Sequence, residues 1–411
     1  MRCLIITNHF YPESFRINDV AFEMVKAGYD VTVLTAIPDY PLGKYYEGYG
    51  LFKKRSEIKN GVKIVRAPII PRGNGNKLRL MLNYISVFFS FICYGFWLGV
   101  TSKFDYIFVH DTSPAFILWS AIVVKKMQKI PLDLWILDMW PESLVAGGIR
   151  NAKVFTIIQR MMDFFYQKCD VIHISSNGFR RMLTDRKVED AIIRYLPNWG
   201  DRKMRTSSNK MELPALPKGF IIMFAGNLGE AQNLENVLKV ANKVALEKKN
   251  VHWVFLGNGR KKKWMERYVK ENKLNDCVHL LGSFPIETMP YFFSQADVLL
   301  VSLKNDMVFN MTLPAKVQAY MMNKKPILAM LNGEGQDIIK KASCGFCANS
   351  DDIDGMYDLV NRIVVISKNR LAEIGKAGYQ FYLDNFSYEK CMNEIFVCMQ
   401  KLCKEYELIK R

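Results

Sequence analysis

The 411-residue sequence is poor in several features, and their scarcity excludes several protein classes. It has no low-complexity stretch, and its 25 glycines and 15 prolines are average numbers. Half of the residues are hydrophobic and 24% are charged, which excludes a disordered, collagen-like or disulfide-knot protein. Acidic side chains are fewer than basic ones, 40 against 57, and the net charge is +17. This excess favours an anionic partner such as a nucleotide, a phosphorylated substrate, nucleic acid or anionic lipid.

A secretion signal and a zinc motif are also missing. The opening MRCLIITNHFYP has one charge, a short apolar run and no cleavage pattern. The nine cysteines are an odd and scattered set, which favours reduced thiols in the cytoplasm. Cys344 and Cys347 form a C-x-x-C pair, but no second Cys/His pair has zinc-finger spacing, so we expect two buried thiols and no metal.

Apolar runs alternate with helical patterns in two successive halves, which predicts an α/β fold with parallel sheets. The boundaries place an N-terminal domain at 1–198, a polar linker at 199–218, a C-terminal domain at 219–386 and an amphipathic helix at 387–411. We expect two Rossmann-like domains with the site in a cleft between them, at the carboxyl ends of the strands. The predicted strands are Cys3–Thr7, Val31–Thr35, Ile64–Ala67, Tyr106–His110, Leu132–Leu137, Val171–Ser175, Phe220–Ala225, Val251–Gly257, Val278–Leu281, Val298–Val301 and Pro326–Met330.

Met81–Thr101 has no charged residue and is long enough to span a bilayer. It follows a strongly basic stretch, Gly43–Leu80, as expected of a protein on an anionic cytoplasmic leaflet. Three arrangements remain open at this point: a helix embedded in the membrane interface, a buried helix of a soluble domain, or a true span. The first is favoured, because strands on both sides of the segment belong to one predicted sheet.

The C-terminal half contains glycine turns that suit a phosphate. In FAGNLGEAQNL a strand runs into G-x-x-G, and the amides of Asn227–Glu230 are expected at a helix N-terminus. The glycines do not form G-x-G-x-x-G, so a standard dinucleotide site is not indicated. FLGNGRKKK is a second glycine turn with basic residues, and Lys316 is expected in the first turn of a helix after Pro314. A turn without ligand and solvated surface lysines are the alternatives.

In the N-terminal half, polar residues follow the predicted strands. Asp138 ends one strand, and a carboxylate there orients a hydroxyl or takes a proton. His110 ends the preceding strand and is a candidate base or phosphate partner. Three further charges follow the first strand: Glu13, Arg16 and Asp19. A turn aspartate, a structural histidine and solvated charges are the alternatives. The other four histidines, without evident partners, are expected to be structural.

Six ordered segments make the chain resemble the retaining glycosyltransferases of family 4, which have the GT-B fold, over nearly its whole length. They are NHFYPES with the following helix and IPDYPLGKYYEGY loop, DMWPES, GNLGEAQNLENVL, LGNG, FPIETMPYFFSQADVLLVSL and TLPAKVQAYMMNKKPIL. Within that family the chain is most similar to bacterial O-antigen, capsule and colanic acid transferases, including N-acetyl-L-fucosamine transferases. The motifs do not identify the donor sugar, the base, the acceptor sugar or the linkage.

The resemblance implies a nucleotide-sugar donor in the C-terminal domain, with UDP as the favoured nucleotide, and a glycan acceptor on polyprenyl diphosphate at the N-terminal domain. It implies a cytoplasmic enzyme, peripheral or monotopic on the inner face of the bacterial plasma membrane. No metal or other cofactor is implied, because helix N-termini, Lys and Arg offset the diphosphate charge. Candidate donor residues are Gly226, Asn227, Leu228, Gly229, Lys262 and Lys316. Candidate acceptor-side residues are Glu13, Arg16, Asp19 and Glu142, with Asp138 and His110 as catalytic candidates.

The chain departs from the family pattern at two glutamates, which are Met311 and Ala319 here. The second usually binds the donor ribose, so Gln318 and Glu334 become the candidates for that role. The histidine often found before the DMWPES aspartate is Leu137. Two alternative functions follow: a non-catalytic accessory subunit, supported by the missing glutamates, and a nucleotide-sugar 2-epimerase of the same fold. Nucleic-acid binding is not expected, because no basic stripe interleaved with aromatics is present.

Overall fold

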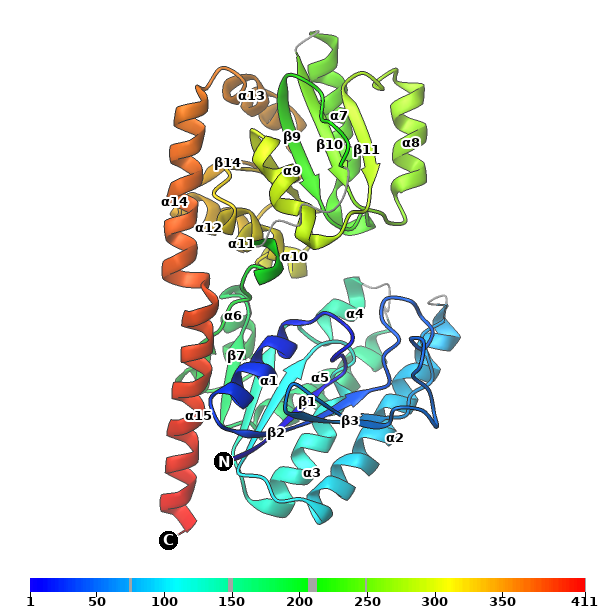
Figure 1. Ribbon diagram of the computed structural model, residues 1–411, viewed down its shortest axis with the longest axis vertical. Coiled ribbons are helices and arrows are strands. Elements are labelled where there is room, and N and C mark those ends of the chain that lie inside the picture. Colours follow the sequence, from blue (N-terminus) through cyan, green and yellow to red (C-terminus); the bar gives the residue numbers. More distant parts are fainter. Residues whose placement is uncertain (74–75, 147–150, 206–212, 248–249, 411) are drawn as a thin grey trace. The chain divides into compact units, whose positions relative to one another are not determined.

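The computed structural model describes residues 1–73, 76–146, 151–205, 213–247 and 250–410 (Figure 1). The chain forms two compact units, called here unit 1 (Met1–Pro197 with Cys391–Arg411) and unit 2 (Asn198–Lys390). Residues 206–212, within the predicted linker, lie outside the described residues. Each unit contains one mostly or wholly parallel sheet with helices on both faces, so the prediction of two Rossmann-like domains is confirmed.

The sheet of unit 1 has eight strands in the order β3-β4-β2-β1-β5-β6-β7-β8, and only β3 is antiparallel to its neighbour. The predicted strands of this half are confirmed, whereas the half-polar edge strand β3 and the three-residue β8 were not predicted. The strands are β1 (Arg2–Thr7), β2 (Asp30–Ala36), β3 (Ser56–Lys59), β4 (Val62–Ala67), β5 (Tyr106–Asp111), β6 (Leu132–Ile136), β7 (Val171–Ile174) and β8 (Ile193–Tyr195).

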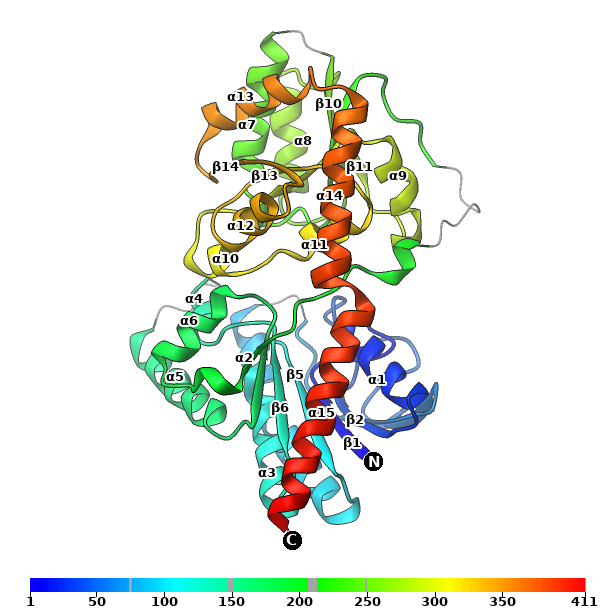
Figure 2. The ribbon, with the colours of Figure 1, turned by 90° about the vertical axis from the view of Figure 1, so that its left-hand side faces the viewer.

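Helices cover both faces of this sheet. Figures 1 and 2 show α1 and α15 on one face and α2 and α3 on the other. Right-handed crossovers require α1 to lie on the face opposite α2 and α3. From Cys391 onward α15 packs on unit 1, where Tyr406 donates to Asp170 at 2.6 Å. The helices are α1 (Arg16–Lys26), α2 (Lys77–Thr101), α3 (Leu118–Gln128), α4 (Glu142–Ala146), α5 (Ala152–Tyr166), α6 (Gly178–Asp185) and α15 (Tyr388–Lys410).

A buried polar cluster lies in the core of unit 1. One oxygen of Asp133 on β6 accepts a hydrogen bond from the Tyr106 hydroxyl at 2.6 Å and lies 3.1 Å from Nε2 of His173 on β7. The sulfur of Cys398 on α15 lies within 4.8 Å of a carboxylate oxygen of Asp133 and a ring nitrogen of His173. The expectation that His173 lacks a partner is therefore wrong. The buried carboxylate instead ties three strands to the C-terminal helix.

Unit 2 has a wholly parallel sheet in the order β11-β10-β9-β12-β13-β14. Its strands are β9 (Phe220–Ala225), β10 (Val251–Leu256), β11 (Val278–Gly282), β12 (Val298–Ser302), β13 (Ile327–Met330) and β14 (Gly345–Ala348). Its helices are α7 (Leu234–Leu246), α8 (Lys262–Glu271), α9 (Met289–Gln295), α10 (Met307–Met311), α11 (Ala315–Met322), α12 (Glu334–Lys341), α13 (Ile353–Ile363) and α14 (Lys368–Phe386). The core cluster includes Phe224 and Trp253 of the sheet with Val237 of α7 and Val360 of α13.

Candidate active site at the carboxyl ends of the strands

Two glycines bring strand ends together in unit 2. Gly226 follows β9 with φ +146° and donates its amide to the carbonyl of Leu256 at 2.8 Å. Gly257 follows β10 with φ +147°, and a Cβ there would overlap the carbonyl oxygen of Gly226. Backbone conformation and close approach both require glycine at these positions. The two glycine turns thus form one continuous backbone surface at the carboxyl edge of the sheet.

The residues after Gly226 form an ordered loop rather than the first turn of a helix. A 3₁₀ turn, Glu230–Gln232, precedes α7, which begins at Leu234. Leu228 donates its amide to the carbonyl of Asn258 at 2.8 Å, and its carbonyl accepts from the amide of Lys261 at 2.9 Å. The expectation that all four amides of Asn227–Glu230 sit at a helix N-terminus is therefore wrong. The Leu228 amide is engaged within the protein, and Asn227 and Gly229 flank it.

Lys316 lies beside this loop. It occupies the first turn of α11 after Pro314, as predicted, and its Nζ lies 4.2 Å from the centroid of the Phe224 ring. It donates to the side-chain oxygen of Gln232, and a Cβ at Gly226 would be 2.7 Å from its Cε. Burial lowers the pKa of Lys316 to about 7, and no carboxylate offsets this effect in the described part of the chain. An anion against Gly226 would supply the missing partner.

The other lysines near the loop are already paired. Lys261 lies 2.6 Å from Glu235 and 3.1 Å from Glu230, and the hydrogen bond that Lys261 donates to Glu235 raises the pKa of Lys261. Lys304 lies 3.4 Å from the same Glu230. Lys262 pairs with Glu266 of its own helix at 3.9 Å. Of the predicted cations, Lys316 is therefore the one whose charge faces the glycine turn.

The ribose candidates lie on α11 and α12. Gln318 is buried, and neither atom of its amide has a hydrogen-bond partner among the described residues, a state that costs free energy unless a ligand or water fills it. Glu334 opens α12 after Gly333, where φ is +68° and a Cβ would overlap the carbonyl oxygen of Asn310. That close approach brings the start of α12 against α10, which ends at Met311.

In unit 1 the loops after β1 and β2 join in a polar network. One oxygen of Glu13 accepts from the backbone amides of Asp39 and Tyr40 at 3.0 and 2.7 Å, and the other lies 2.9 Å from Nδ1 of His9. Nη2 of Arg72 lies 3.4 Å from Nε2 of His9. Because arginine has only donors, Nε2 accepts and Nδ1–H donates to Glu13. The expectation that His9 has no partner is wrong.

This network extends to the loops after β5 and β6. Arg72 donates to the carbonyl of Ser113 at 2.9 Å, and the Ser113 hydroxyl donates to Asp138 while accepting from the indole of Trp140 at 2.8 Å. Burial raises the pKa of Asp138, although the hydrogen bond from Ser113 acts in the opposite direction. Asp138 therefore lies half-buried at the carboxyl edge, held by a short chain of donors.

Asp111 ends β5 close to Asp138. It is fully buried, and neither side-chain oxygen has a hydrogen-bond partner in the described ranges. Burial raises the pKa of Asp111 well above its usual range, and the charge of Asp138 adds to the effect. Such a shift favours the protonated form of the carboxyl group, which can donate a hydrogen bond to a ligand, as catalytic acids do. No role was predicted for Asp111 from the sequence.

The remaining acceptor-side candidates lie in different settings. Nδ1 of His110 is 3.0 Å from the Thr7 hydroxyl, and burial lowers the pKa of His110 to about 3, so the ring brings no positive charge to a phosphate. Arg16 and Asp19 lie half-buried in the first turn of α1. Glu142, at the start of α4, is buried and lies 2.7 Å from Arg186. Glu142 thus has an ion-pair partner within unit 1.

The structure adds site residues that the sequence analysis missed: His9, Asp39, Arg72, Asp111 and Ser113. Asp138 was predicted because polar residues at the carboxyl ends of parallel strands mark a binding site. The same pattern applies to four of these residues, which lie at or just after strand ends: His9, Asp39, Asp111 and Ser113. Arg72 comes from a loop between β4 and α2, and no sequence pattern marks it. His9, Glu13 and Asp39 are close enough to hold a metal ion. The cation beside them is the guanidinium of Arg72, and the backbone amide of Arg72 donates to Asp39 at 3.0 Å.

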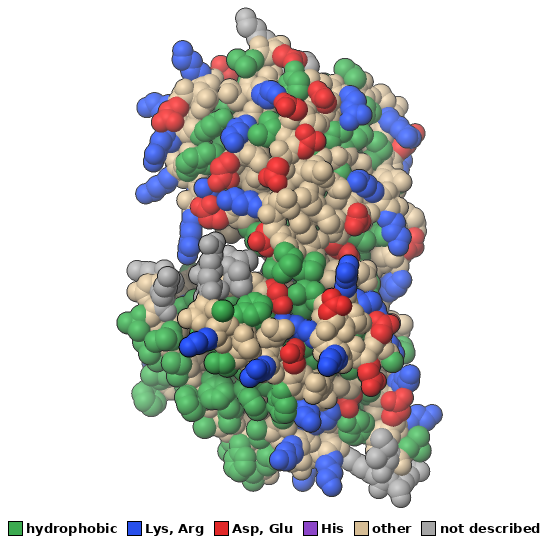
Figure 3. All heavy atoms as spheres, turned by 180° about the vertical axis from the view of Figure 1, so that it is seen from behind, with side chains coloured by type: hydrophobic (Ala, Val, Ile, Leu, Met, Phe, Trp, Pro, Cys, Tyr) green, Lys and Arg blue, Asp and Glu red, His purple; other side chains and the backbone are tan. Residues whose placement is uncertain are grey.

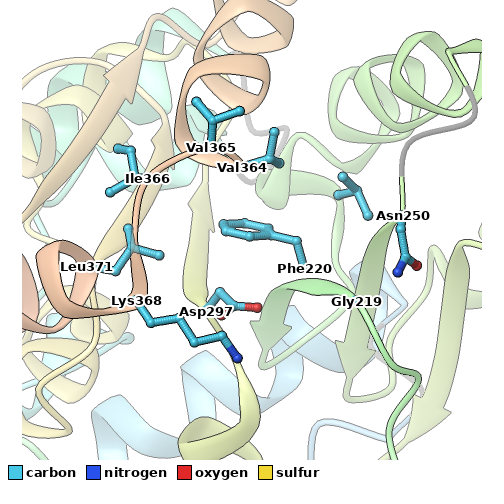
Figure 4. Close-up of a pocket in the computed structure, with 10 residues that line it drawn as sticks. Gly219, Phe220, Asn250, Asp297, Val364, Val365, Ile366, Lys368 and Leu371 are labelled. Carbon is cyan, nitrogen blue, oxygen red and sulfur yellow. The ribbon is translucent and has the colours of Figure 1, made fainter.

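A pocket of about 510 Å³ in unit 2 lies away from these residues (Figure 4). Its lining residues precede the strands or lie in the turn between α13 and α14, as Phe220, Asn250, Asp297 and Val365 show. Lys368 is its cationic lining residue, and most of the remaining surface is apolar. The pocket is therefore at the amino ends of the strands, opposite the edge that carries Gly226 and Lys316.

Comparisons with known proteins agree with this architecture. Residues 14–199 match the family model described as Glycosyl transferase 4-like domain, and residues 207–381 match Glycosyl transferases group 1. A Pseudomonas aeruginosa protein named as a probable glycosyltransferase, WbjE, is 23% identical over 82% of this chain and 84% of its own. WcaI of Escherichia coli (strain K12), a candidate colanic acid biosynthesis glycosyl transferase by name, is 23% identical over 77% of this chain and 80% of its own. The structure of Anabaena Alr3699/HepE in complex with UDP superposes with a TM-score of 0.70 at 12% identity, over 98% of this chain and all of the other.

Proposed function

Because this chain belongs to the family 4 glycosyltransferases with the GT-B fold, we propose that it transfers a sugar from a nucleotide-sugar, with retention of configuration, to a glycan on polyprenyl diphosphate. It is a glycosyltransferase of the O-antigen or colanic acid type. The proposed donor is UDP-linked, and N-acetyl-L-fucosamine is a candidate sugar. The solved Anabaena relative that binds UDP supports the choice of base.

The observation that carries the donor part of the proposal is the position of Lys316 against the glycine turn. Its ammonium lies beside Gly226 with a pKa lowered by burial to about 7, without a carboxylate partner in the described part of unit 2. A diphosphate bound to the turn would receive a charge-assisted hydrogen bond from it. Gly226, Asn227, Leu228 and Gly229 would line that diphosphate. Lys262, which pairs with Glu266, would need to leave that partner to take part.

The sugar and ribose contacts are proposed for the edge next to the turn. Gln318 has two buried amide atoms without partners among the described residues, and Glu334 opens the neighbouring α12. They would take over the ribose-binding role of the family's second glutamate, whose position is Ala319 here. A pair of ribose hydroxyls that bonded the amide oxygen and nitrogen of Gln318 would remove the free-energy cost of leaving these two atoms unpaired.

The acceptor side is proposed for unit 1. Asp138 would orient the attacking hydroxyl or take its proton, and neutral His110 would fix the strand edge through Thr7. Glu13, Arg16 and Asp19 would contact the acceptor, with Glu142 positioned by Arg186. No metal ion is proposed, because Lys316 and backbone amides would offset the diphosphate charge. Transfer that continues in EDTA supports this, and its loss on chelation would contradict it.

The deciding experiment is a thermal-shift and hydrolysis screen of the purified chain against UDP-, GDP-, dTDP- and CMP-sugars. One nucleotide should raise the melting temperature, since a ligand that binds only the folded state stabilises it, and its sugar should be released slowly. Lys316→Met should lose the shift, whereas Lys270→Met, an exposed lysine at the end of α8, should keep it. Absence of a shift with every donor would contradict the proposal.

A second candidate, a non-catalytic accessory subunit, is favoured by the two missing glutamates at Met311 and Ala319. It would bind the nucleotide-sugar and show the thermal shift without releasing or transferring the sugar. Incubation with a polyprenyl-diphosphate acceptor and a radiolabelled donor separates the two candidates. Labelled lipid supports the transferase, and a shift without any turnover supports the accessory subunit. The 2-epimerase alternative predicts an epimerised nucleotide-sugar in the absence of acceptor.

A further inference from the structure

The helix α2 (Lys77–Thr101) presents an apolar stripe to solvent along its whole length. The exposed side chains recur every three or four residues, so they share one face of the helix. Phe89 is 62% exposed, and Phe96 and Trp97 are 56% and 49% exposed. The stripe comprises Leu78, Met81, Ile85, Phe89, Phe96, Trp97 and Val100. At 1.5 Å per residue, a 25-residue helix extends about 37 Å.

The opposite face of α2 packs tightly on α3. Two small residues permit the close approach: a Cβ on Gly95 would be 2.7 Å from the Ser120 side chain, and one on Gly99 would be 2.8 Å from the sulfur of Met127. Val87, Phe91 and Leu98 are buried on the same side. By length and composition α2 is the one helix of the described chain that could cross a membrane. Its packing instead holds it along the surface of unit 1.

The apolar surface continues onto α5 (Ala152–Tyr166). Phe88 contacts Trp119 of α3 with ring centroids 6.5 Å apart, and Trp119 contacts Phe164 of α5 at 5.6 Å. On α5 Ile157 is 67% exposed, with Val154 and Phe164 also exposed. Figure 3 shows hydrophobic side chains gathered over this side of unit 1. We call these exposed residues of α2 and α5 the apolar face.

Basic residues surround the apolar face, and acidic residues are nearly absent from it. In sequence, α2 and α3 contain no Asp or Glu, and α5 contains only Asp163, which lies 3.8 Å from Arg186. The exposed cations on these helices or just after them are Arg79, Lys103, Lys126, Lys129, Lys153, Arg160 and Lys168. None of the seven pairs with a carboxylate within the described ranges.

We propose that the apolar face docks unit 1 on an anionic lipid leaflet, with α2 and α5 lying flat in the headgroup region. This inference rests on the proposed function, since the lipid-linked acceptor would be presented there. Charge decides between a membrane and a second copy of the chain. A two-fold pairing through this face would bring like cations together, whereas anionic headgroups offer the opposite charge, and aromatic side chains suit the interface.

The test is co-sedimentation of the full chain with vesicles of phosphatidylcholine alone or mixed with phosphatidylglycerol. The intact protein should bind the mixed vesicles and bind neutral vesicles at least tenfold less. The triple variant Phe89→Ser, Phe96→Ser, Trp97→Ser should lose at least tenfold of its binding to mixed vesicles. The matched control is Leu246→Ser with Val365→Ser, two strongly exposed apolar residues of unit 2, which should bind like the intact protein.

A second variant keeps the test decisive if the triple variant does not fold. Lys153→Glu with Arg160→Glu changes only exposed residues of α5 and should weaken binding to mixed vesicles while binding to neutral vesicles stays unchanged. Undiminished sedimentation of both variants would overturn the proposal. It would also be overturned if vesicles were not bound and the triple variant converted a dimer into a monomer in sedimentation velocity.

Nucleotide binding separates failure of this inference from failure of the proposed function. Folded docking variants should keep the thermal shift with the donor, because Gly226 and Lys316 belong to unit 2. They should also transfer sugar to a water-soluble, short-chain prenyl diphosphate acceptor at the rate of the intact protein. Transfer to a long-chain acceptor in vesicles should fall with vesicle binding. An intact protein that binds vesicles but no donor would contradict the function and not the docking.

Discussion

The pH dependence of donor binding should reveal the role of Lys316. In the free protein, burial lowers the pKa of its ammonium group from 10.5 to about 7. A diphosphate next to the ammonium favours the charged form, so the pKa rises on binding and the complex takes up a proton. Donor affinity should therefore be highest below about pH 7 and fall as the pH rises, until the pKa of the bound state is reached.

The size of this pH effect on donor affinity follows from the uptake of one proton on binding. Affinity changes at most tenfold for each pH unit between the free and bound pKa values, so the dissociation constant should rise up to about 100-fold from pH 7 to pH 9. Lys316→Arg keeps its charge over this range and should remove the dependence. Lys316→Met lacks the charged hydrogen bond, about 1.5–3 kcal/mol, and should bind about 10- to 150-fold more weakly near pH 6.5.

Isothermal titration calorimetry with the nucleotide-sugar identified by the thermal-shift screen would measure these constants, because such a diphosphate diester does not titrate in this range. A pH dependence that persists in Lys316→Arg would refute the assignment to this lysine.

The pH dependence of protein stability provides the second readout. Between pH 7 and pH 10.5 the unfolded lysine binds more protons than the folded one, so the free protein should gain stability as pH rises. Lys316→Met should lack that gain.

Three further predictions concern single residues. Gly257→Ala should lower the free energy of unfolding by about 3 kcal/mol or more in urea titrations, because its Cβ would overlap Gly226 at positive φ. The control Gly28→Ala, whose Cβ would have nothing within 4 Å, should lower it by about 1 kcal/mol. Equal losses in the two variants would contradict the argument. Asp138→Asn should reduce transfer by about 10²-fold or more and leave the donor thermal shift unchanged; an equal loss of both would place it on the donor side. Asp111→Asn should gain stability relative to the intact protein as pH rises above 3.8, because the buried Asp111 keeps its proton while the unfolded residue loses it; parallel pH profiles would refute that.

The fold was predictable because buried parallel strands are nearly continuous apolar runs, such as Val298–Ser302. The strands that were not predicted lack this signal: β3 is the half-polar SEIK at a sheet edge, β8 has only three residues, and β14 is the short edge strand GFCA. The position of Lys316 at a helix start was also predictable, since Pro314 marks the first turn. Its ring partner Phe224 was not, because that contact joins residues far apart in the chain.

The sequence predicts which strand edge carries the candidate site, but it does not predict which side chains pair with one another there. In the basic run at Lys261–Lys263, only Lys262 was a predicted donor residue, and the sequence does not show that Lys261 is held by Glu230 and Glu235. Those glutamates lie in the first turns after the glycine loop, and their approach depends on how that loop folds. Likewise, sequence spacing does not predict that Arg72 reaches both His9 and Ser113. Long side chains from loops are placed by tertiary packing, which local periodicity does not describe.

The distribution of destabilising groups supports a transferase over a subunit that only binds nucleotide. In unit 2, the depressed pKa of Lys316 and the unpaired amide of Gln318 cost stability in the free protein, and the proposed donor would relieve both costs. A binding-only subunit would need no more than this. Unit 1, however, bears the same kind of cost at its own strand edge, where the buried carboxyl of Asp111 has no hydrogen-bond partner among the described residues and lies near Asp138. Strain of this kind at a second edge is explained when a second substrate is positioned and activated there.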